Sequence, residues 1–305
     1  MQTAISNGNT TMTKEQWLEA RKNSIGGSDI GSIFNLNKYK SVIQVWLEKT
    51  RQIESQDISE KMPVKVGKFL EPFVIAEFEK TTGLEISRKG RFATHEKYPF
   101  MSGTIDAEGI DIDGTPFILE CKTTDSYSAK EWDGTDTMPD SYQLQLLHYM
   151  IIAGVEKGYL CCLIGNKELS IKCVTLTPDI ENMIISRCVW FWNLVETKTM
   201  PPVDDSSACT DIINEMFPSA NPGTSIELAP EWNSEIEQLL KVKEGIKQLQ
   251  SEEKLIKNKI CLELMDNESA YTTQYNITYK NVHKDGYFVQ PSDSRQLRTS
   301  KRKEK

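Results

Sequence analysis

The spacing of hydrophobic residues changes along the first two thirds of the chain between the period of a helix and that of a strand. Helices are expected to begin at Thr13 (with a capping box to Gln16), Ser41, Gly67, Asp140 and Thr177. Apolar runs at 157–164 and 168–177 meet at Gly165-Asn166 and predict a hairpin of two strands. This order predicts an α/β (α+β) fold, a central mixed sheet flanked by helices.

The two ends of the chain have other patterns. Residues 1–12 are polar and are predicted to be disordered, and the main domain is expected at 13–198. Five prolines among polar residues at 199–230 predict a linker or surface arm. Residues 231–305 are predicted to form a helical and β-hairpin extension with strands at 271–281 and 287–290.

Apolar residues at a spacing of three to four continue along the extension to about Met265, interrupted at Glu253. This spacing is typical of a short coiled coil or of a helical hairpin, and both alternatives stay open. The final segment, 295–305, is strongly basic. It is either a contact for nucleic acid or a solvated tail.

The segment 103–123 is predicted to form two strands joined by a turn, with Asp106 on the first strand and Glu120 and Lys122 on the second. Glu120 and Lys122 are two residues apart and therefore share a face. A two-residue turn at Asp113-Gly114 would place Asp106 opposite Cys121, on the other face. A three-residue loop ending at Gly114 would place Asp106 opposite Glu120 and gather the three charges.

Two carboxylates beside a lysine favour a divalent-metal site. Mg²⁺ prefers hard oxygen ligands, commonly one or two carboxylates together with water and phosphate. A bound metal acidifies water, and a neighbouring lysine can orient or deprotonate that water. The pattern therefore suits hydrolysis of phosphodiesters, although a solvated strand face would carry the same residue types.

Other polar residues lie in unusual positions. Glu71 is on the apolar face of its predicted helix, where it either has a partner such as a metal or serves as an N-cap before Pro72. Gln143 shares a stripe with leucines, as a functional amide or as a buried, hydrogen-bonded one. Arg21 precedes a glycine-rich turn at which Ser28 is expected to cap a helix, either an anion site or a plain capped turn.

Composition narrows the class of protein. The 305 residues can bury a substantial core. Seven cysteines without a Cys-x-x-Cys pair argue against a zinc or iron–sulfur framework and for reduced thiols. No signal peptide or apolar stretch of membrane length is found, so no membrane role is expected. The net charge of −8 does not suggest a general DNA-binding surface, but a nuclease that holds DNA in a narrow cleft can be acidic overall.

These residues follow one another in a known order. The series is Trp17-x3-Arg21-x6-Ser28, Gly67-Lys68-x2-Glu71, Asp106, Glu120-x-Lys122 and Gln143-x-Gln145. Over residues 13–197 this series resembles the lambda-exonuclease group, and more closely the YqaJ-like viral recombinases, among the PD-(D/E)XK nucleases. The proline that usually precedes the first aspartate is Ile105 here.

The resemblance implies a restriction-endonuclease-like core and a role for each matched residue. Asp106, Glu120, Glu71 and the backbone carbonyl of Cys121 would bind Mg²⁺, with two ions expected and Mn²⁺ as a substitute. Lys122 would position the attacking water, and Gln143 would support the water or the scissile phosphate. The 5′-phosphate of a DNA end would be held by Arg21, Ser28 and Thr104.

The activity implied is 5′→3′ exonuclease digestion of double-stranded DNA ends in phage-type recombination. The resemblance also implies a ring-shaped homotrimer, a single-strand-annealing protein as partner, and the cytoplasm of a bacterial host. Two alternatives stay open: an endonuclease with the same fold, and a DNA-end-binding protein without catalysis. The intact Asp, Glu and Lys disfavour the second.

Overall fold

The computed structural model describes residues 5–7, 10–286, 288, 291 and 297–299. The chain divides into two compact units, Met1–Met216 and Phe217–Lys305. All the residues singled out for chemistry lie in the first unit.

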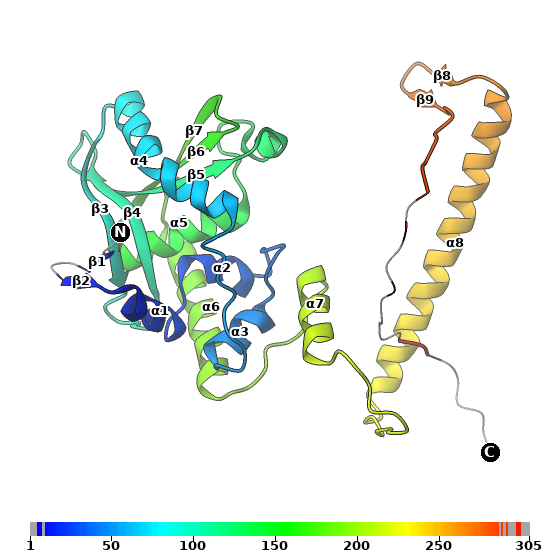
Figure 1. Ribbon diagram of the computed structural model, residues 1–305, viewed down its shortest axis with the longest axis horizontal. Coiled ribbons are helices and arrows are strands. Elements are labelled where there is room, and N and C mark those ends of the chain that lie inside the picture. Colours follow the sequence, from blue (N-terminus) through cyan, green and yellow to red (C-terminus); the bar gives the residue numbers. More distant parts are fainter. Residues whose placement is uncertain (1–4, 8–9, 287, 289–290, 292–296, 300–305) are drawn as a thin grey trace. The chain divides into compact units, whose positions relative to one another are not determined.

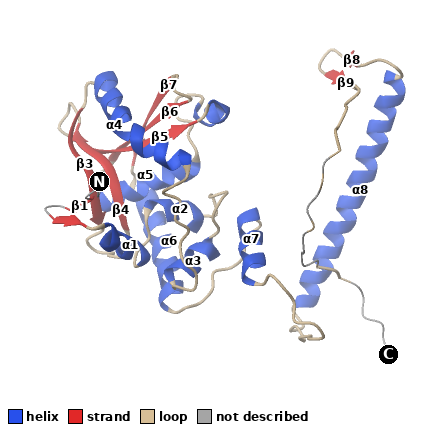
Figure 2. Cartoon of the chain, viewed as in Figure 1, coloured by secondary structure: helices blue, strands red, loops and turns tan. Residues whose placement is uncertain are grey.

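The first unit is a mixed sheet between helices (Figures 1 and 2). Its sheet order is β2-β1-β3-β4-β5-β6-β7. The strands are β1 (Ile5–Asn7), β2 (Thr10–Met12), β3 (Glu85–Thr94), β4 (Ser102–Ile110), β5 (Pro116–Thr124), β6 (Lys157–Ile164) and β7 (Glu168–Thr175). The helices are α1 (Lys14–Lys22), α2 (Gly27–Ile33), α3 (Val42–Lys49), α4 (Met62–Thr82), the 3₁₀ helix η1 (Ser126–Trp132), α5 (Asp140–Ala153), α6 (Pro178–Glu196) and α7 (Ser207–Met216).

Strand directions confirm the predicted mixed α/β fold. Neighbouring strands are antiparallel except for β1–β3 and β5–β6, which are parallel. A parallel pair needs a long connection, and η1 with α5 supplies it between β5 and β6. Helix α4 covers one face of the sheet, while α5, α2 and α6 pack on the other (Figure 1).

The β4–β5 hairpin adopts the register of the three-residue loop. Ala107 pairs with Leu119 and Ile110 with Pro116. The Asp111 N–H donates to the Thr115 carbonyl at 2.8 Å, which closes the loop. Gly114 has φ +85°, the left-handed conformation that this loop requires. Continuing the ladder by one position places Asp106 opposite Glu120.

A small apolar cluster fixes α4 on the sheet. Phe78 of α4 and Phe117 of β5 are both buried, with ring centroids 6.0 Å apart. Tyr159 of β6 lies edge-on to both rings, at 5.3 Å from Phe78 and 5.1 Å from Phe117. These contacts set the position of α4, and therefore of Glu71, relative to β5.

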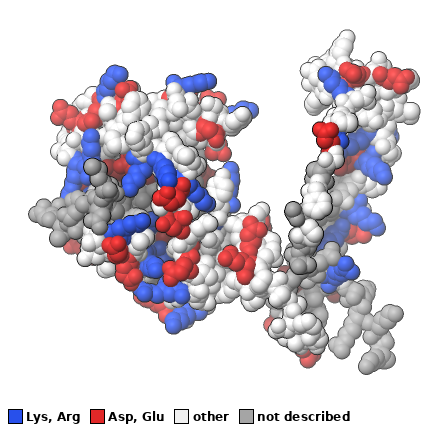
Figure 3. All heavy atoms as spheres, in the orientation of Figure 1, with Lys and Arg blue, Asp and Glu red and all other residues white. Residues whose placement is uncertain are grey.

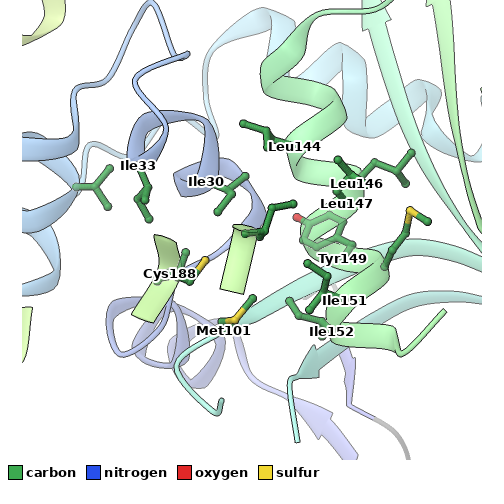
Figure 4. Close-up of a cluster of buried hydrophobic side chains, with 14 of the residues drawn as sticks. Ile30, Ile33, Met101, Leu144, Leu146, Leu147, Tyr149, Ile151, Ile152 and Cys188 are labelled. Atoms are coloured by element: carbon green, nitrogen blue, oxygen red, sulfur yellow. The ribbon is translucent and has the colours of Figure 1, made fainter. Parts of the chain in front are cut away.

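The larger cluster lies on the other face and centres on α5, most of whose residues from Leu144 onward are buried. Figure 4 shows part of it, with Ile30 and Ile33 of α2 and Cys188 of α6 near the α5 side chains. Because α5 is buried on nearly all sides, a hydrophobic stripe cannot define its exposed face. The argument for Gln143 from such a stripe is therefore weak.

Several boundaries differ from those predicted. Residues 5–7 and 10–12 form short strands, whereas a disordered segment was expected. Helix α4 begins at Met62 and continues through Pro72, so Glu71 is inside the helix and is not its N-cap. The predicted linker at 199–230 contains α7, whose Ala208, Cys209 and Ile212 are buried and which packs on α3 within the first unit.

The second unit consists of α8 (Trp232–Leu264) followed by the hairpin β8 (Ser269–Tyr271) and β9 (Asn276–Thr278). Helix α8 is uninterrupted (Figure 2), so the helical hairpin considered as an alternative does not form. The segment 271–281 was predicted as one strand, but it contains only the last residue of β8, the turn and β9. Most of the segment 287–290 and most of the basic tail lie outside the described residues.

The aromatic cluster under α4 yields a stability prediction. Replacing Phe78 by Ala should lower the free energy of unfolding by about 3–5 kcal/mol, because it opens a cavity against Phe117 and Tyr159. Phe69 is on the same helix but is 83% exposed, so Phe69→Ala should change the free energy of unfolding by less than about 0.5 kcal/mol. Urea unfolding of both variants measures the difference. Equal effects would mean that α4 is not held on the sheet by this cluster.

Candidate active site

The hairpin and α4 bring three acidic side chains to one place. Asp106 comes from β4, Glu120 from β5 and Glu71 from α4. Burial, and then the neighbouring Glu120 and Glu71 carboxylates, raise the pKa of Asp106 well above its ordinary value. Burial and Glu120 also raise the pKa of Glu71. The three carboxylates therefore repel one another in a poorly solvated site.

Only part of the hydrogen-bonding capacity of these acids is used. Asp106 Oδ2 accepts the Cys121 N–H at 2.8 Å. Glu120 Oε1 accepts from Lys122 Nζ at 2.6 Å and from Gln145 Nε2 at 2.7 Å. Glu120 Oε2 is buried and accepts no hydrogen bond from any residue that the structure describes. Leaving such an oxygen unpaired is costly, so this atom is ready to accept a cation.

These observations fit a divalent cation. Excess negative charge, an unpaired buried carboxylate oxygen and hard oxygen donors together suit Mg²⁺. The N–H and C=O of one strand residue point toward the same neighbouring strand, so the Cys121 carbonyl is also directed to the Asp106 side. Among the described residues, no group of three or more His, Cys, Asp or Glu side chains is arranged so that it could hold a metal ion. Mg²⁺ does not need one, because water and substrate phosphate complete its shell.

Lys122 is held as a cation beside these acids. Burial lowers the pKa of Lys122, but Glu120 and then Asp106 outweigh this effect, so that its pKa lies above the ordinary value. Its Nζ contacts Gln145 Oε1 at 3.0 Å and lies 4.9 Å from the centre of the Tyr142 ring. In this arrangement Lys122 is a charged hydrogen-bond donor that can orient water or phosphate, and it is not a free base.

Gln145 occupies the position in the site that was expected of Gln143. It bonds to Glu120, to Lys122 and, at 3.2 Å, to the Tyr149 hydroxyl. Gln143 is two residues earlier on α5, about 200° around the helix axis, and is half-buried. The Gln143-x-Gln145 motif contains both residues. Only the contacts of Gln145 with Glu120 and Lys122 of β5 show which of the two lies in the site.

Tyr149 is a site residue that the sequence pattern did not reveal. A Cβ atom at Gly27 would lie 2.4 Å from its ring, and one at Gly103 would lie 2.2 Å from it. Both positions must therefore be glycine for the buried ring to fit. An isolated glycine within a predicted strand, as at Gly103, was the available signal of a close approach.

A second polar cluster lies next to those two glycines. Arg21 donates to the Ser28 hydroxyl at 2.9 Å, and its guanidinium lies 4.7 Å from the centre of the Trp17 ring. The Trp17 indole N–H donates to the Thr104 hydroxyl at 3.1 Å. Arg21, Ser28 and Thr104, predicted to act together, are thus linked through Trp17. Ser28 is exposed, so an anion from solution can reach the cluster.

The cap of α2 differs from the one expected. Gly26 is the N-cap, and Asp29 accepts its N–H at 3.0 Å, so Ser28 is inside the helix and its hydroxyl is left for Arg21. Asp29 also pairs with Lys49 at 2.7 Å and Lys40 at 3.4 Å. Burial would raise the pKa of Asp29, but Lys49, Lys40 and Arg21 outweigh it and hold this pKa well below the ordinary value. The buried ion group therefore fixes the turn that carries Ser28.

A buried histidine ties this turn to β4. The Ser102 N–H donates to the Ile25 carbonyl at 2.9 Å. His148 Nε2 lies 3.2 Å from the carbonyl oxygens of both Ile25 and Ser102. Burial lowers the pKa of His148 to about 4, so it is neutral at physiological pH. The Ser28 and Thr104 segments are thereby held at fixed separation.

Sequence comparison identifies the class to which this fold and site belong. A family model described as the YqaJ-like viral recombinase domain matches residues 16–156. The chain is 34% identical over 277 residues to a Bacillus subtilis (strain 168) protein described as "Uncharacterized protein YqaJ", covering 90% of this chain and 85% of that protein. The chain therefore belongs to the YqaJ-like viral recombinase family, as its motifs predicted.

Solved structures are more distantly similar. An alkaline exonuclease from Laribacter hongkongensis has a TM-score of 0.48 and 13% identity, covering 67% of this chain and 98% of that one. A phage-related exonuclease from Haemophilus somnus 129PT has a TM-score of 0.41 and 11% identity, covering 64% of this chain and 96% of that one.

Among the described residues, no helix has the length and hydrophobicity needed to cross a bilayer.

Crowding of the carboxylates predicts a pH-dependent stability without metal. The raised pKa of Asp106 means that its ionisation destabilises the fold, so stability falls as pH rises from the unfolded pKa through the folded one. In a chelator, Asp106→Asn should therefore increase the free energy of unfolding at pH 8, and the gain should shrink on acidification.

Thermal unfolding at several pH values measures this difference, with and without added Mg²⁺. Added Mg²⁺ should stabilise the wild type more than Asp106→Asn if the acids hold the ion, because a ligand that binds only the folded state stabilises it. Identical pH profiles for the two proteins in chelator would contradict the crowding of carboxylates at Asp106.

Proposed function

We propose that this protein is a Mg²⁺-dependent 5′→3′ exonuclease that degrades one strand of linear double-stranded DNA in phage-type recombination. The observation that carries the proposal is the unpaired, buried Glu120 Oε2 in a cluster of three acids beside the Lys122 ammonium. Such a cluster is unstable by itself and suits a phosphodiester with its cation.

Asp106, Glu120, Glu71 and the Cys121 carbonyl would hold the metal. Bound there, Mg²⁺ would supply charge neutralisation for the phosphate and acidify water. The chain's own groups do the remaining work. Lys122 would donate a hydrogen bond that orients the attacking water or a phosphate oxygen, and Gln145 keeps the ammonium in place through its 3.0 Å bond.

The Arg21 cluster supports action at an end over action within a strand. A guanidinium offers a planar fork of donors to a terminal phosphate, which carries more charge than an internal diester. Tyr149 lies against Gly27 and Gly103, the sequence neighbours of Ser28 and Thr104, while its hydroxyl reaches Gln145. One buried side chain thus spans from the phosphate cluster to the hydrolytic cluster.

Charge on the remaining surface supports a local DNA contact. On the face shown in Figure 3, basic and acidic side chains of the first unit are interspersed. With a net charge of −8, affinity for DNA would come from local sites such as the Arg21 cluster and the metal-bound acids, and not from the charge of the whole chain. The homotrimer and the annealing partner implied by the resemblance remain predictions.

The proposal is tested with linear duplex labelled at either the 5′ or the 3′ end and with circular plasmid. A 5′→3′ exonuclease releases the 5′ label at once and the 3′ label only late, and it leaves the circle intact. Cleavage of the circle would favour the endonuclease alternative. Binding of ends without hydrolysis at any Mg²⁺ or Mn²⁺ concentration would favour the non-catalytic one.

Loss of the hydrolytic groups should separate catalysis from binding. Glu120→Ala should abolish hydrolysis while leaving DNA binding intact. Lys122→Ala should slow hydrolysis by about 10²–10⁴-fold, the range for a positioned proton donor. Lys89→Ala is the control, since Lys89 is exposed on β3 and outside the cluster. Near-normal turnover of Lys122→Ala would show that the hairpin is not the active centre.

A 5′-phosphate should matter to the wild-type enzyme. We expect faster digestion of 5′-phosphorylated than of 5′-hydroxyl duplex, and Arg21→Ala should remove this preference. Arg51→Ala is a matched control, because Arg51 pairs with Glu19 in the same region and does not reach Ser28. An Arg21→Ala enzyme slowed equally on both duplexes would mean that Arg21 has a structural role or is a general backbone contact.

A further inference from the structure

Helix α8 of the second unit has an apolar surface that no other described residue of that unit covers. The helix contains 33 residues without interruption and is therefore about 50 Å long. Val242, Ile246, Leu249, Ile256 and Ile260 are between 38% and 67% exposed. A stripe of branched aliphatic residues of this length is costly to expose to water, so it indicates a missing partner.

The stripe has the repeat of a coiled coil. With Leu239 assigned to position a, the a positions are 239, 246, 253 and 260, and the d positions are 242, 249 and 256. All of these positions are Leu, Ile or Val except Glu253. Three other exposed leucines lie outside the seam, Leu240 at position b and Leu255 and Leu262 at position c. A sustained a/d repeat is the signature of helices that pack knobs into holes.

Flanking charges favour a second copy of the same helix in parallel orientation. In a parallel pair each g position lies near the e position of the following heptad in the other helix. This places Glu252 beside Lys257 of the other copy, twice by symmetry. The other g–e pairs combine Gln with Lys, Gly with Gln, and Lys with Leu, so no like charges meet at these flanking positions.

The antiparallel arrangement that best aligns the apolar positions lacks this complementarity. It sets Ile246 opposite Leu249, and as a result places Glu252 opposite Gly245 and Lys257 opposite Ile236. No opposite charges meet across that pair. Glu253 would face Val242 in two separate layers, each burying a carboxylate against a methyl group.

Glu253 also selects one register. In an in-register parallel pair the two Glu253 side chains share a single layer, and each is partly neutralised by Lys257 one turn later, at 2.6 Å. A shift by one heptad would place each Glu253 against Ile246 or Ile260 of the other helix. The apolar packing of two layers would then be disrupted. A single polar residue at an a position is a known means of fixing register at a cost in stability.

From the exposed seam and its charges, we propose that α8 is a self-association element that forms a parallel, in-register coiled coil with α8 of a second copy of this chain. This function is separate from the nuclease chemistry, because every residue of the hydrolytic and phosphate clusters lies in the first unit.

Site-specific disulfide formation in the full-length protein tests the proposal. Leu249→Cys, at a d position, should form a disulfide-linked dimer under mild oxidation. Leu255→Cys is equally apolar and exposed but at position c, and should link no more than the wild type with its seven native thiols. Equal linking by both variants, or none by either, would overturn the proposal. Linking of Leu249→Cys only when mixed with Ile246→Cys would show an antiparallel pair.

Two further substitutions within the seam, each compared with a control outside it, test the seam itself. Adding Ile246→Lys to Leu249→Cys should reduce the linked fraction at least about tenfold, whereas adding Leu255→Lys should leave it unchanged. Glu253→Leu should let Leu249→Cys link at lower protein concentration, whereas Glu244→Leu, at the outer f position, should not. Equal linking with Ile246→Lys and with Leu255→Lys would show that the contact is not a coiled coil through this seam. Equal linking with Glu253→Leu and with Glu244→Leu would show the same.

Discussion

Crowding of negative charge on the β4–β5 hairpin is the constraint around which the first unit is arranged. The hairpin register sets Asp106 opposite Glu120, and α4 adds Glu71. Lys122 lies within the cluster and Lys68 acts on Glu71, but burial and mutual repulsion still raise the pKa values of Asp106 and Glu71, and one Glu120 oxygen accepts no hydrogen bond from any described residue. A protein retains such an arrangement only where a bound group compensates the charge. Carboxylate and carbonyl oxygens are the ligands that a hard metal ion prefers, so a metal ion suits this role.

Rigid packing holds this unstable cluster together. The Phe78–Phe117–Tyr159 group fixes α4 on one face of the sheet, and the buried α5 presents Gln145 from the other. Tyr149, wedged against Gly27 and Gly103, then couples the position of α5 to the turn that carries Ser28. The arrangement therefore depends on side chains on both faces of the sheet, and on two glycines whose replacement would displace one ring.

Much of the fold could be predicted from the sequence because its signals are local. The caps at Thr13, Ser41 and Thr177 and the loop at Gly114 all act within a few residues. The family follows from motifs spaced along the chain. What could not be predicted depends on packing over long sequence distances. The choice of Gln145, the role of Tyr149 and the capping of α2 by Asp29 are decided by contacts with β5, β4 and the lysines of α3 and its preceding loop.

The central claim is that the hairpin acids hold a catalytic cation, and locating that cation tests it most directly. Crystals of the protein soaked with Mn²⁺ should show an anomalous density peak bounded by Asp106, Glu120 and the Cys121 carbonyl. The Glu120→Ala protein, soaked in the same way, should show none. A fully formed hairpin with no peak at saturating Mn²⁺, or a peak that persists without Glu120, would contradict the account.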